Sequence, residues 1–252
     1  MCTWSALVVL AAQLLSLPTL AQTPPAQTPS ISWSTDIFSK YVNIDDDALL
    51  HGAPVIQTSL NVKFENGIYL YLWGSKSLDM DSPVENLGNE IDYAVGWAGK
   101  TGPVGVDISV YYWNLSDPLL FKSHGDVVQS VVEVNKEFIL GKQTFTPYIQ
   151  FLPTFPFDGT TAGIYAAVGL KHSVDLTEIL AFNQAGRVGY DAPGIYGLTS
   201  GYIFRYDAAF AWQVSKNSVL RLPSFRAFFP ITSLSDGRTN EYIFGAGYDR
   251  TF

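Results

Sequence analysis

Hydrophobic and polar residues alternate along most of the chain after residue 30. The clearest stretch is residues 202–214 (YIFRYDAAFAWQV), where apolar or aromatic side chains stand at every second position and Arg205, Asp207 and Gln213 stand between them. The same period recurs in residues 55–64, 89–99 and 104–113. Because successive side chains of a β-strand point to opposite faces, this period predicts strands with one apolar and one polar face.

The alternation divides the chain into about twelve predicted strands. They lie near residues 32–42, 55–64, 67–76, 89–99, 104–113, 127–138, 143–152, 162–173, 178–189, 200–214, 218–229 and 240–252. The connections alternate between tight turns, such as 65–66, and longer loops, such as 77–88. This rhythm is typical of outer-membrane barrels, and a Greek-key sandwich has no reason to keep it. The sequence therefore predicts an all-β, transmembrane up-and-down antiparallel β-barrel of about 12 strands, with ten strands as the alternative.

Composition supports a membrane barrel over a helical membrane protein. Hydrophobic residues make up 47% of the 252 residues and charged residues only 15%, whereas an average soluble domain is nearer a quarter charged. Yet no apolar run after Ile31 reaches the ~18 residues that a membrane-spanning helix needs. A closed barrel pairs every backbone group without water, so its strands can lie in lipid.

The N-terminal segment has the pattern of a secretory signal peptide, predicted for residues 1–21. Its apolar core runs from Ala6 to Leu17, and the small residues Thr19 and Ala21 fit a cleavage site. A membrane anchor is the alternative, which the short apolar core disfavours.

The predicted cleavage leaves a Pro/Thr/Gln-rich flexible periplasmic lead-in at 22–30 and the barrel at 31–252. The one cysteine, Cys2, lies in the signal segment, so the mature chain has no disulfide or thiol chemistry. The formal net charge of −8 argues against a nucleic-acid partner.

Three short motifs mark the first half of the chain. Pro54 and Gln57 form a Pro-x-x-Gln turn into a strand, Gly-x-Tyr-x-x-x-Trp-Gly-Ser occupies residues 67–75, and Glu-x-Asp occupies 90–92. In these motifs the chain resembles the TorF-type porin family of Proteobacteria, over roughly residues 30–140. The resemblance implies an outer-membrane channel of unassigned substrate and adds no catalytic residue.

If the polar faces point inward, the lumen carries two charged walls. The acidic wall consists of Glu90, Asp92, Asp107 and Glu133, and the basic wall consists of Lys171, Arg187, Arg205 and Arg221, with Arg226 as the alternative to Arg221. In a ring of about twelve strands the two walls would face each other, and the transverse field would orient dipolar solutes and tune ion selectivity. The alternative is that these charges pair and plug the interior. The two interpretations predict different pore sizes.

The last predicted strand ends on an aromatic residue. Its lipid-facing side chains are expected to include Tyr242, Phe244, Tyr248 and Phe252. The strand resembles the C-terminal recognition strand of outer-membrane proteins, which the barrel-assembly machinery reads. Arg250, third from the end, departs from that pattern, but an arginine near the rim can extend its charge to the interface.

No arrangement of residues indicates an enzyme, a metal site or a cofactor. His51 and His124 fall in predicted loops, and His172 and Ser173 are sequence neighbours whose side chains point to opposite faces of a strand. The acidic triplet 45–47 lies in a predicted external loop without the ligand spacing of a calcium site.

The sequence therefore predicts a porin-like channel for passive diffusion of small hydrophilic solutes, in the outer membrane of a Gram-negative bacterium. The expected partners are outer-membrane lipid and lipopolysaccharide, the barrel-assembly machinery and the solutes themselves. Two alternatives stay open: a non-conducting structural or adhesive barrel, and a soluble secreted β-sandwich that binds a ligand.

Overall fold

The structure is a computed structural model that describes residues 28–42, 49–79, 89–114, 126–156, 162–192, 201–232 and 239–252. The predicted signal peptide, His124 and the acidic triplet 45–47 lie outside these residues, as does the predicted lead-in up to residue 27. None of the described residues belongs to a helix long and apolar enough to cross a membrane.

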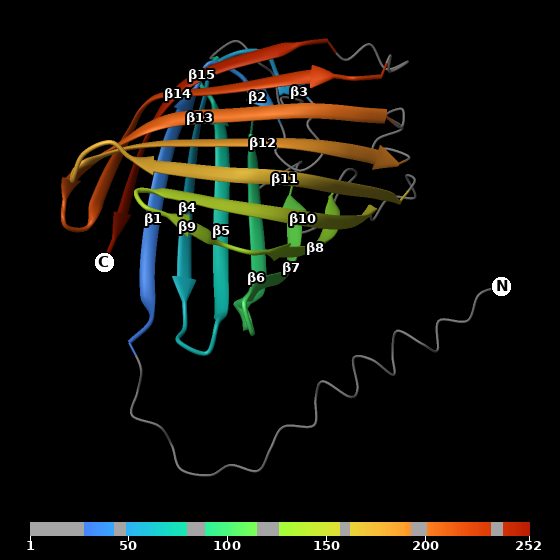
Figure 1. Cartoon of the computed structure of the whole chain (residues 1–252). Helices are drawn as coiled ribbons and strands as arrows, with labels where there is room; N and C mark the ends of the chain where they lie inside the picture. Colours follow the sequence, from blue (N-terminus) through green and yellow to red (C-terminus); the bar gives the residue numbers. More distant parts are fainter. Residues whose placement is uncertain are drawn as a thin grey trace, which may run out of the picture.

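Twelve strands form a closed antiparallel ring (Figure 1). They are β1 (Ser30–Phe38), β4 (Val55–Lys63), β5 (Ile68–Ser77), β6 (Glu90–Thr101), β7 (Val104–Asn114), β8 (Val127–Asn135), β10 (Gln143–Pro156), β11 (Gly163–Asp175), β12 (Leu180–Ala192), β13 (Gly201–Ser215), β14 (Ser218–Pro230) and β15 (Glu241–Thr251). Each strand pairs with its neighbours in sequence, and β15 pairs with β1 to close the ring. The predicted fold class is thus confirmed with twelve strands, and the β-sandwich alternative is wrong.

Three short strands depart from the predicted boundaries. β2 (Tyr41–Val42) and β3 (Leu49–His51) form a separate hairpin, so the first barrel strand ends at Phe38 instead of continuing to residue 42. β9 (Phe138–Leu140) folds back on the start of β10, so the strand predicted at 127–138 is divided in two. Both departures occur where a polar or turn-forming residue interrupts the alternation.

The connections give the barrel two different rims. The short-turn rim holds both barrel termini and turns such as 102–103 and 216–217, while the long-loop rim holds all the longer connections. At the short-turn rim, the backbone N–H of Phe252 donates to the carbonyl oxygen of Ile31 at 2.8 Å. The last residue therefore takes part in closing the ring.

Apolar side chains cover the outside of the barrel. On β13, Tyr202 and Trp212 are 48% and 41% exposed, whereas Ile203 and Arg205 on the opposite face are 1% and 7% exposed. Large apolar residues point outward in the same way on most strands. Such a surface is stable in lipid, and the polar face of each strand is left to line the interior.

Inward-facing glycines make room for large side chains from neighbouring strands. Tyr69 lies over Gly96 and Tyr148 lies over Gly169, each pair in direct register across two strands. A Cβ atom at either glycine would overlap the tyrosine ring. The rings cover backbone that would otherwise be open, as in other sheets where an aromatic side chain packs on a facing glycine.

Candidate functional site in the barrel lumen

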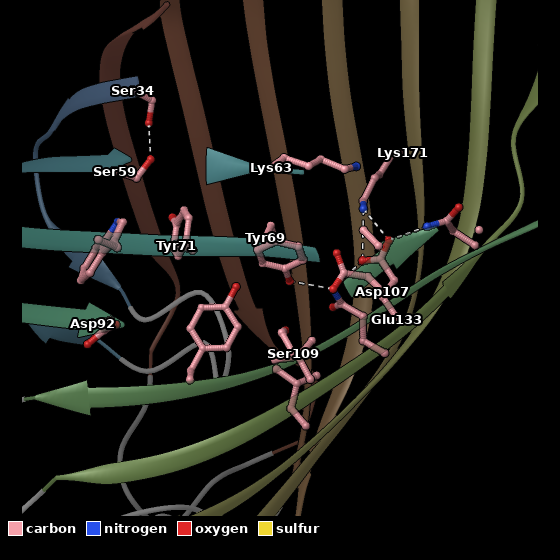
Figure 2. A pocket seen from close by; sticks show the side chains of 18 of the residues that line it. Ser34, Ser59, Lys63, Tyr69, Tyr71, Asp92, Asp107, Ser109, Glu133 and Lys171 are labelled. Carbon is pink, nitrogen blue, oxygen red and sulfur yellow. Dashed lines mark hydrogen bonds and ion pairs between the residues drawn. The ribbon is translucent and has the colours of Figure 1, made fainter. Parts of the chain in front are cut away.

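A cavity runs along the inside of the wall formed by β4 to β8, and we call it the longitudinal cavity (Figure 2). Its volume is about 720 Å³. On β4 its lining extends from Gln57 to Lys63, and on β6 from Glu90 to Lys100. Six residues of a strand rise about 20 Å, so the cavity follows most of the depth of the barrel.

Formal charges of both signs line the longitudinal cavity in equal number. The acidic residues are Asp36, Glu90, Asp92, Asp107 and Glu133, and the basic residues are Lys63, Lys100, Lys171, Arg221 and Arg226. All four residues of the predicted acidic wall are therefore in its lining. The cavity suits hydrated polar solutes better than apolar ones.

A connected group of polar side chains lies toward the short-turn rim of this cavity. The carboxylate of Glu133 accepts hydrogen bonds from Lys171 at 2.9 Å, Gln150 at 2.8 Å and Asn135 at 3.0 Å. Nearby, the Tyr69 hydroxyl donates to Asp107 at 2.8 Å (Figure 2). These bonds hold the two carboxylates on the wall and compensate for their partial burial.

Aromatic residues occupy the part of the cavity nearer the long-loop rim. Tyr71 on β5 and Tyr111 on β7 meet edge to face across β6, with ring centroids 6.0 Å apart. Tyr41 contacts Trp73 and donates a 2.5 Å hydrogen bond to Glu90. Glu90 and Asp92 are both at least nine-tenths buried. The β2–β3 hairpin thus reaches into the lumen through Tyr41.

A second cavity, of about 460 Å³, lies inside the opposite part of the ring, and we call it the basic cavity. Four cationic residues line it, namely Lys171, Arg205, Arg221 and Arg226, with Asp207 as the single carboxylate. Lys171, Arg221 and Arg226 also line the longitudinal cavity. These three side chains stand at the boundary between the two cavities.

Asp207 is the centre of the charges in the basic cavity. Arg205 donates two hydrogen bonds to its carboxylate, at 2.7 and 2.8 Å, and Arg226 lies 3.3 Å from it. Arg187 stands directly opposite Arg205 in the strand register and packs over the ring of Tyr165. Like charges in register repel, so the placement of Arg187 adds to the positive potential here.

Arg221 joins three strands at the closing seam of the barrel. Its guanidinium binds Asp249 at 2.7 and 2.8 Å and Asp36 at 2.9 Å, passing over Gly247 on the strand between. The two carboxylates belong to β15 and β1, whose pairing closes the ring. This arrangement was not predicted, because neither Asp36 nor Asp249 had been assigned to the lumen.

A bulge in β14 turns both Arg221 and Arg226 inward. Strict alternation would place them on opposite faces, since their numbers differ by five. The register of β14 shifts between Arg221 and Ser224, where the two residues Leu222 and Pro223 stand opposite a single residue of each neighbouring strand, so that one residue is inserted. The prediction of Arg226 as an alternative to Arg221 is therefore corrected: both line the lumen.

The ring order sets how the two predicted walls are placed. The acidic residues lie on β6, β7 and β8, and the basic residues lie on the consecutive strands β11 to β14. Only β10 separates the two groups on one side, and there Lys171 bonds directly to Glu133. The walls therefore meet at this point, and Asp36, Asp207 and Asp249 interrupt the basic one.

The predicted assembly strand is β15, and its aromatic residues lie on the outer face. Tyr242, Phe244 and Phe252 are exposed. Tyr248 is half-buried, because its ring meets Trp33 edge to face and its hydroxyl donates a 2.9 Å hydrogen bond to the hydroxyl oxygen of Ser218.

The two histidines in the described part of the chain, His51 and His172, do not form a catalytic arrangement with a serine and a carboxylate. His172 stacks on Phe145 and bonds to Gln143 and Gln184, while Ser173 bonds to Asn183 on the inner face. The sequence did not predict that His51 would lie 2.9 Å from the Ser77 hydroxyl.

The contact between His51 and Ser77 has a structural explanation. Among the described residues it is the single hydrogen bond of His51, and the Ser77 oxygen also accepts from the backbone N–H of Asp79. No third group orients the imidazole there, as a serine hydrolase would require. The bond fixes the β2–β3 hairpin to the end of β5. The described ranges also contain no cluster of acidic, histidine or cysteine residues that could hold a metal ion.

Comparison with known proteins identifies the architecture. No protein-family model matches the chain, and no curated protein matches it. Among solved structures, the KdgM porin in complex with disordered oligogalacturonate is similar with a TM-score of 0.54 and 10% identity, over 88% of this chain and 99% of that chain. The chain has the fold of an outer-membrane porin barrel.

Two further structures agree with this assignment. The NanC porin has a TM-score of 0.53 and 9% identity, over 88% of this chain and 98% of that chain. An outer membrane channel from Pseudomonas putida F1 has a TM-score of 0.50 and 10% identity, over 92% of this chain and all of that one. At these identities the similarity concerns the fold alone.

Proposed function

We propose that this protein is an outer-membrane channel of a Gram-negative bacterium, through which small hydrophilic solutes diffuse passively. The observation that carries the proposal is the longitudinal cavity of about 720 Å³, which follows the barrel wall and is lined by charged and polar side chains. A barrel with a purely structural role does not require a polar cavity along its wall. The resemblance of residues 30–140 to the TorF-type porins and the porin neighbours in structure both support this function.

The proposal includes the two charged walls as the selectivity element of the channel. Asp92 and Asp107 would attract cations on one side, and Arg205 and Arg226 would attract anions on the other. Solutes with separated charges would be oriented as they pass between them. We further propose that lipid and lipopolysaccharide surround the outer face and that the barrel-assembly machinery recognises β15.

A non-conducting barrel is the second candidate, and the ion pairs in the lumen favour it. Lys171 bonds to Glu133, and Arg221 bonds to Asp36 and Asp249. Pairs of this kind fill space and reduce the charge that a passing solute meets.

Conductance in planar lipid bilayers separates the two candidates. We expect discrete current steps from purified protein whose folded state is verified by a heat-dependent shift on SDS gels. Ala98→Trp adds an indole inside the longitudinal cavity and should reduce the current per step. Ala166→Trp adds the same group on the outer face of β11 and should leave it unchanged. Folded protein without current would refute the channel and favour the structural barrel.

A further inference from the structure

Two residues on β14 leave hydrogen-bonding capacity unused inside the basic cavity. Ser224 is 6% exposed, and its hydroxyl oxygen is buried without a hydrogen-bond partner. Arg226, two residues along the same inner face, makes one ion pair of 3.3 Å to Asp207 and no hydrogen bond to any described residue. Burying a hydroxyl or a guanidinium without hydrogen-bond partners destabilises the folded protein, unless a further group supplies those hydrogen bonds.

The guanidinium of Arg226 is held in a fixed place. It stacks over the ring of Phe38, with its central carbon 4.0 Å from the ring centroid. Stacking of this kind leaves the N–H groups at the edge of the guanidinium available, because the contact uses its face. The planar fork then matches the two oxygens of a carboxylate.

The charges around Arg226 favour an anion. Arg205, Arg221 and Lys171 line the same cavity, and Asp207 is its single carboxylate. Asp207 is already held by two hydrogen bonds from Arg205. Lys171 is paired with Glu133, and Arg221 is paired with Asp36 and Asp249. Arg226, which shares Asp207 with Arg205, is therefore the cation of this cavity whose charge is least compensated.

The rest of the lining determines what kind of anion fits. Neutral hydroxyl and amide side chains are also part of the lining of the basic cavity, beside apolar ones such as Phe38 and Ala185: Thr144, Thr146, Ser173 and Asn183. Such groups exchange hydrogen bonds with hydroxyl groups of a solute. A volume of about 460 Å³ is in the range of small-molecule sites.

We propose that the basic cavity is a binding subsite for a hydroxylated carboxylate of sugar size, with the carboxylate on the guanidinium of Arg226. This proposal rests on the proposed channel function and names the solute class that it favours. Because Arg226 also lines the longitudinal cavity, a solute bound there would obstruct the conducting path. The channel should then be blocked reversibly by its own substrate class.

D-Gluconate is the probe, and glucose is its uncharged control. With wild-type protein in bilayers in potassium chloride, gluconate should reduce the current at concentrations at which glucose does not. Arg226→Gln should raise the half-blocking concentration of gluconate roughly tenfold or more, since one charge-assisted contact is lost.

Lys100→Gln is the matched control for charge. It also removes one cation from the lumen, but Lys100 lines only the longitudinal cavity. It should leave the half-blocking concentration within about twofold of wild type. An equal effect of Lys100→Gln and Arg226→Gln would overturn the subsite, because it would indicate a general field effect.

Other outcomes are equally decisive. Block by glucose at the same concentration as gluconate would overturn the role of the carboxylate, and block by inorganic phosphate at lower concentration would overturn the assignment to carboxylates. If wild-type protein conducts and gluconate has no effect, the subsite is wrong and the channel stands. If it does not conduct, titration calorimetry of gluconate into the detergent-solubilised barrel tests the subsite alone, and absence of binding there refutes it.

Discussion

Replacing Gly247 with alanine should destabilise the barrel at its closing seam. Gly247 lies on β15, in register with Asp36 on one side and Arg221 on the other. A Cβ atom at this position would overlap the carboxylate of Asp36 and lie 2.8 Å from the central carbon of the Arg221 guanidinium. Because real Cβ contacts are never so short, one of these side chains must move and the contact between Asp36 and Arg221 must open.

The expected loss in the free energy of unfolding depends on which contacts of Arg221 are broken and which are kept. Forcing an extra methyl into a filled site costs about 1–3 kcal/mol. Breaking a buried ion pair outright costs about 3–5 kcal/mol, but Arg221 keeps its two hydrogen bonds to Asp249, and that carboxylate is 39% exposed. We therefore expect a loss of about 2–3 kcal/mol in the free energy of unfolding.

Urea unfolding of the barrel in lipid vesicles, followed by tryptophan fluorescence, measures this loss. Gly186→Ala is the control, because its Cβ would lie 3.6 Å from the ring of Phe204, an ordinary contact. The control should unfold within about 0.5 kcal/mol of wild type. If Gly247→Ala and Gly186→Ala unfold at the same urea concentration, the clamp formed by Arg221 across the seam does not contribute to stability and our reasoning about it is wrong.

Three further predictions concern assembly, selectivity and packing. Deletion of Phe252 should reduce the amount of protein in the outer membrane, measured by immunoblot of membrane fractions; an undiminished amount would contradict the role of β15 in assembly. Asp92→Ala and Arg205→Ala should shift the reversal potential in a potassium chloride gradient in opposite directions, and no shift in either would place both residues off the conducting path. Gly189→Ala should lower the melting temperature in detergent, because the new methyl overlaps the Tyr165 ring; an unchanged melting temperature would show that the ring moves at no cost.

The outer face of the barrel could be predicted from sequence because lipid selects it at every second position. Leu60 on β4 and Ile108 on β7 stand at apolar positions of the alternating stretches 55–64 and 104–113, and they are 39% and 49% exposed. The closed ring also followed from the sequence, since alternating short and long connections leave each strand next to its sequence neighbours.

The charged interior was only partly predictable, because its contacts depend on register. Asp249 stands on the polar face of the last strand, but its bond to Arg221 follows from a bulge that the alternation does not indicate. Pro223 was the available signal, since proline within a strand marks a bulge or an edge. The bond from Lys171 to Glu133 crosses β10, and a pattern read one strand at a time does not contain it.

Small residues on the inner face of a strand do not by themselves indicate a wide lumen. Gly96, Gly169 and Gly247 have no side chain to fill the lumen, yet each is covered by a tyrosine or arginine from an adjacent strand. The width of the lumen therefore depends on pairs of residues on adjacent strands. Where one strand has a glycine, a large side chain of the next strand lies over it and fills that space. Arg221 lies against the wall in the same way, because Gly247 has no side chain between Arg221 and Asp36. The ion pair between Arg221 and Asp36 then stabilises the seam. Among the described residues, Arg226 has only the 3.3 Å ion pair to Asp207, which Arg205 already binds with two hydrogen bonds, so the charge of Arg226 is less compensated than that of Arg221. Solute selectivity should therefore respond more to substitution of Arg226 than of Arg221, although both carry the same charge into the same lumen.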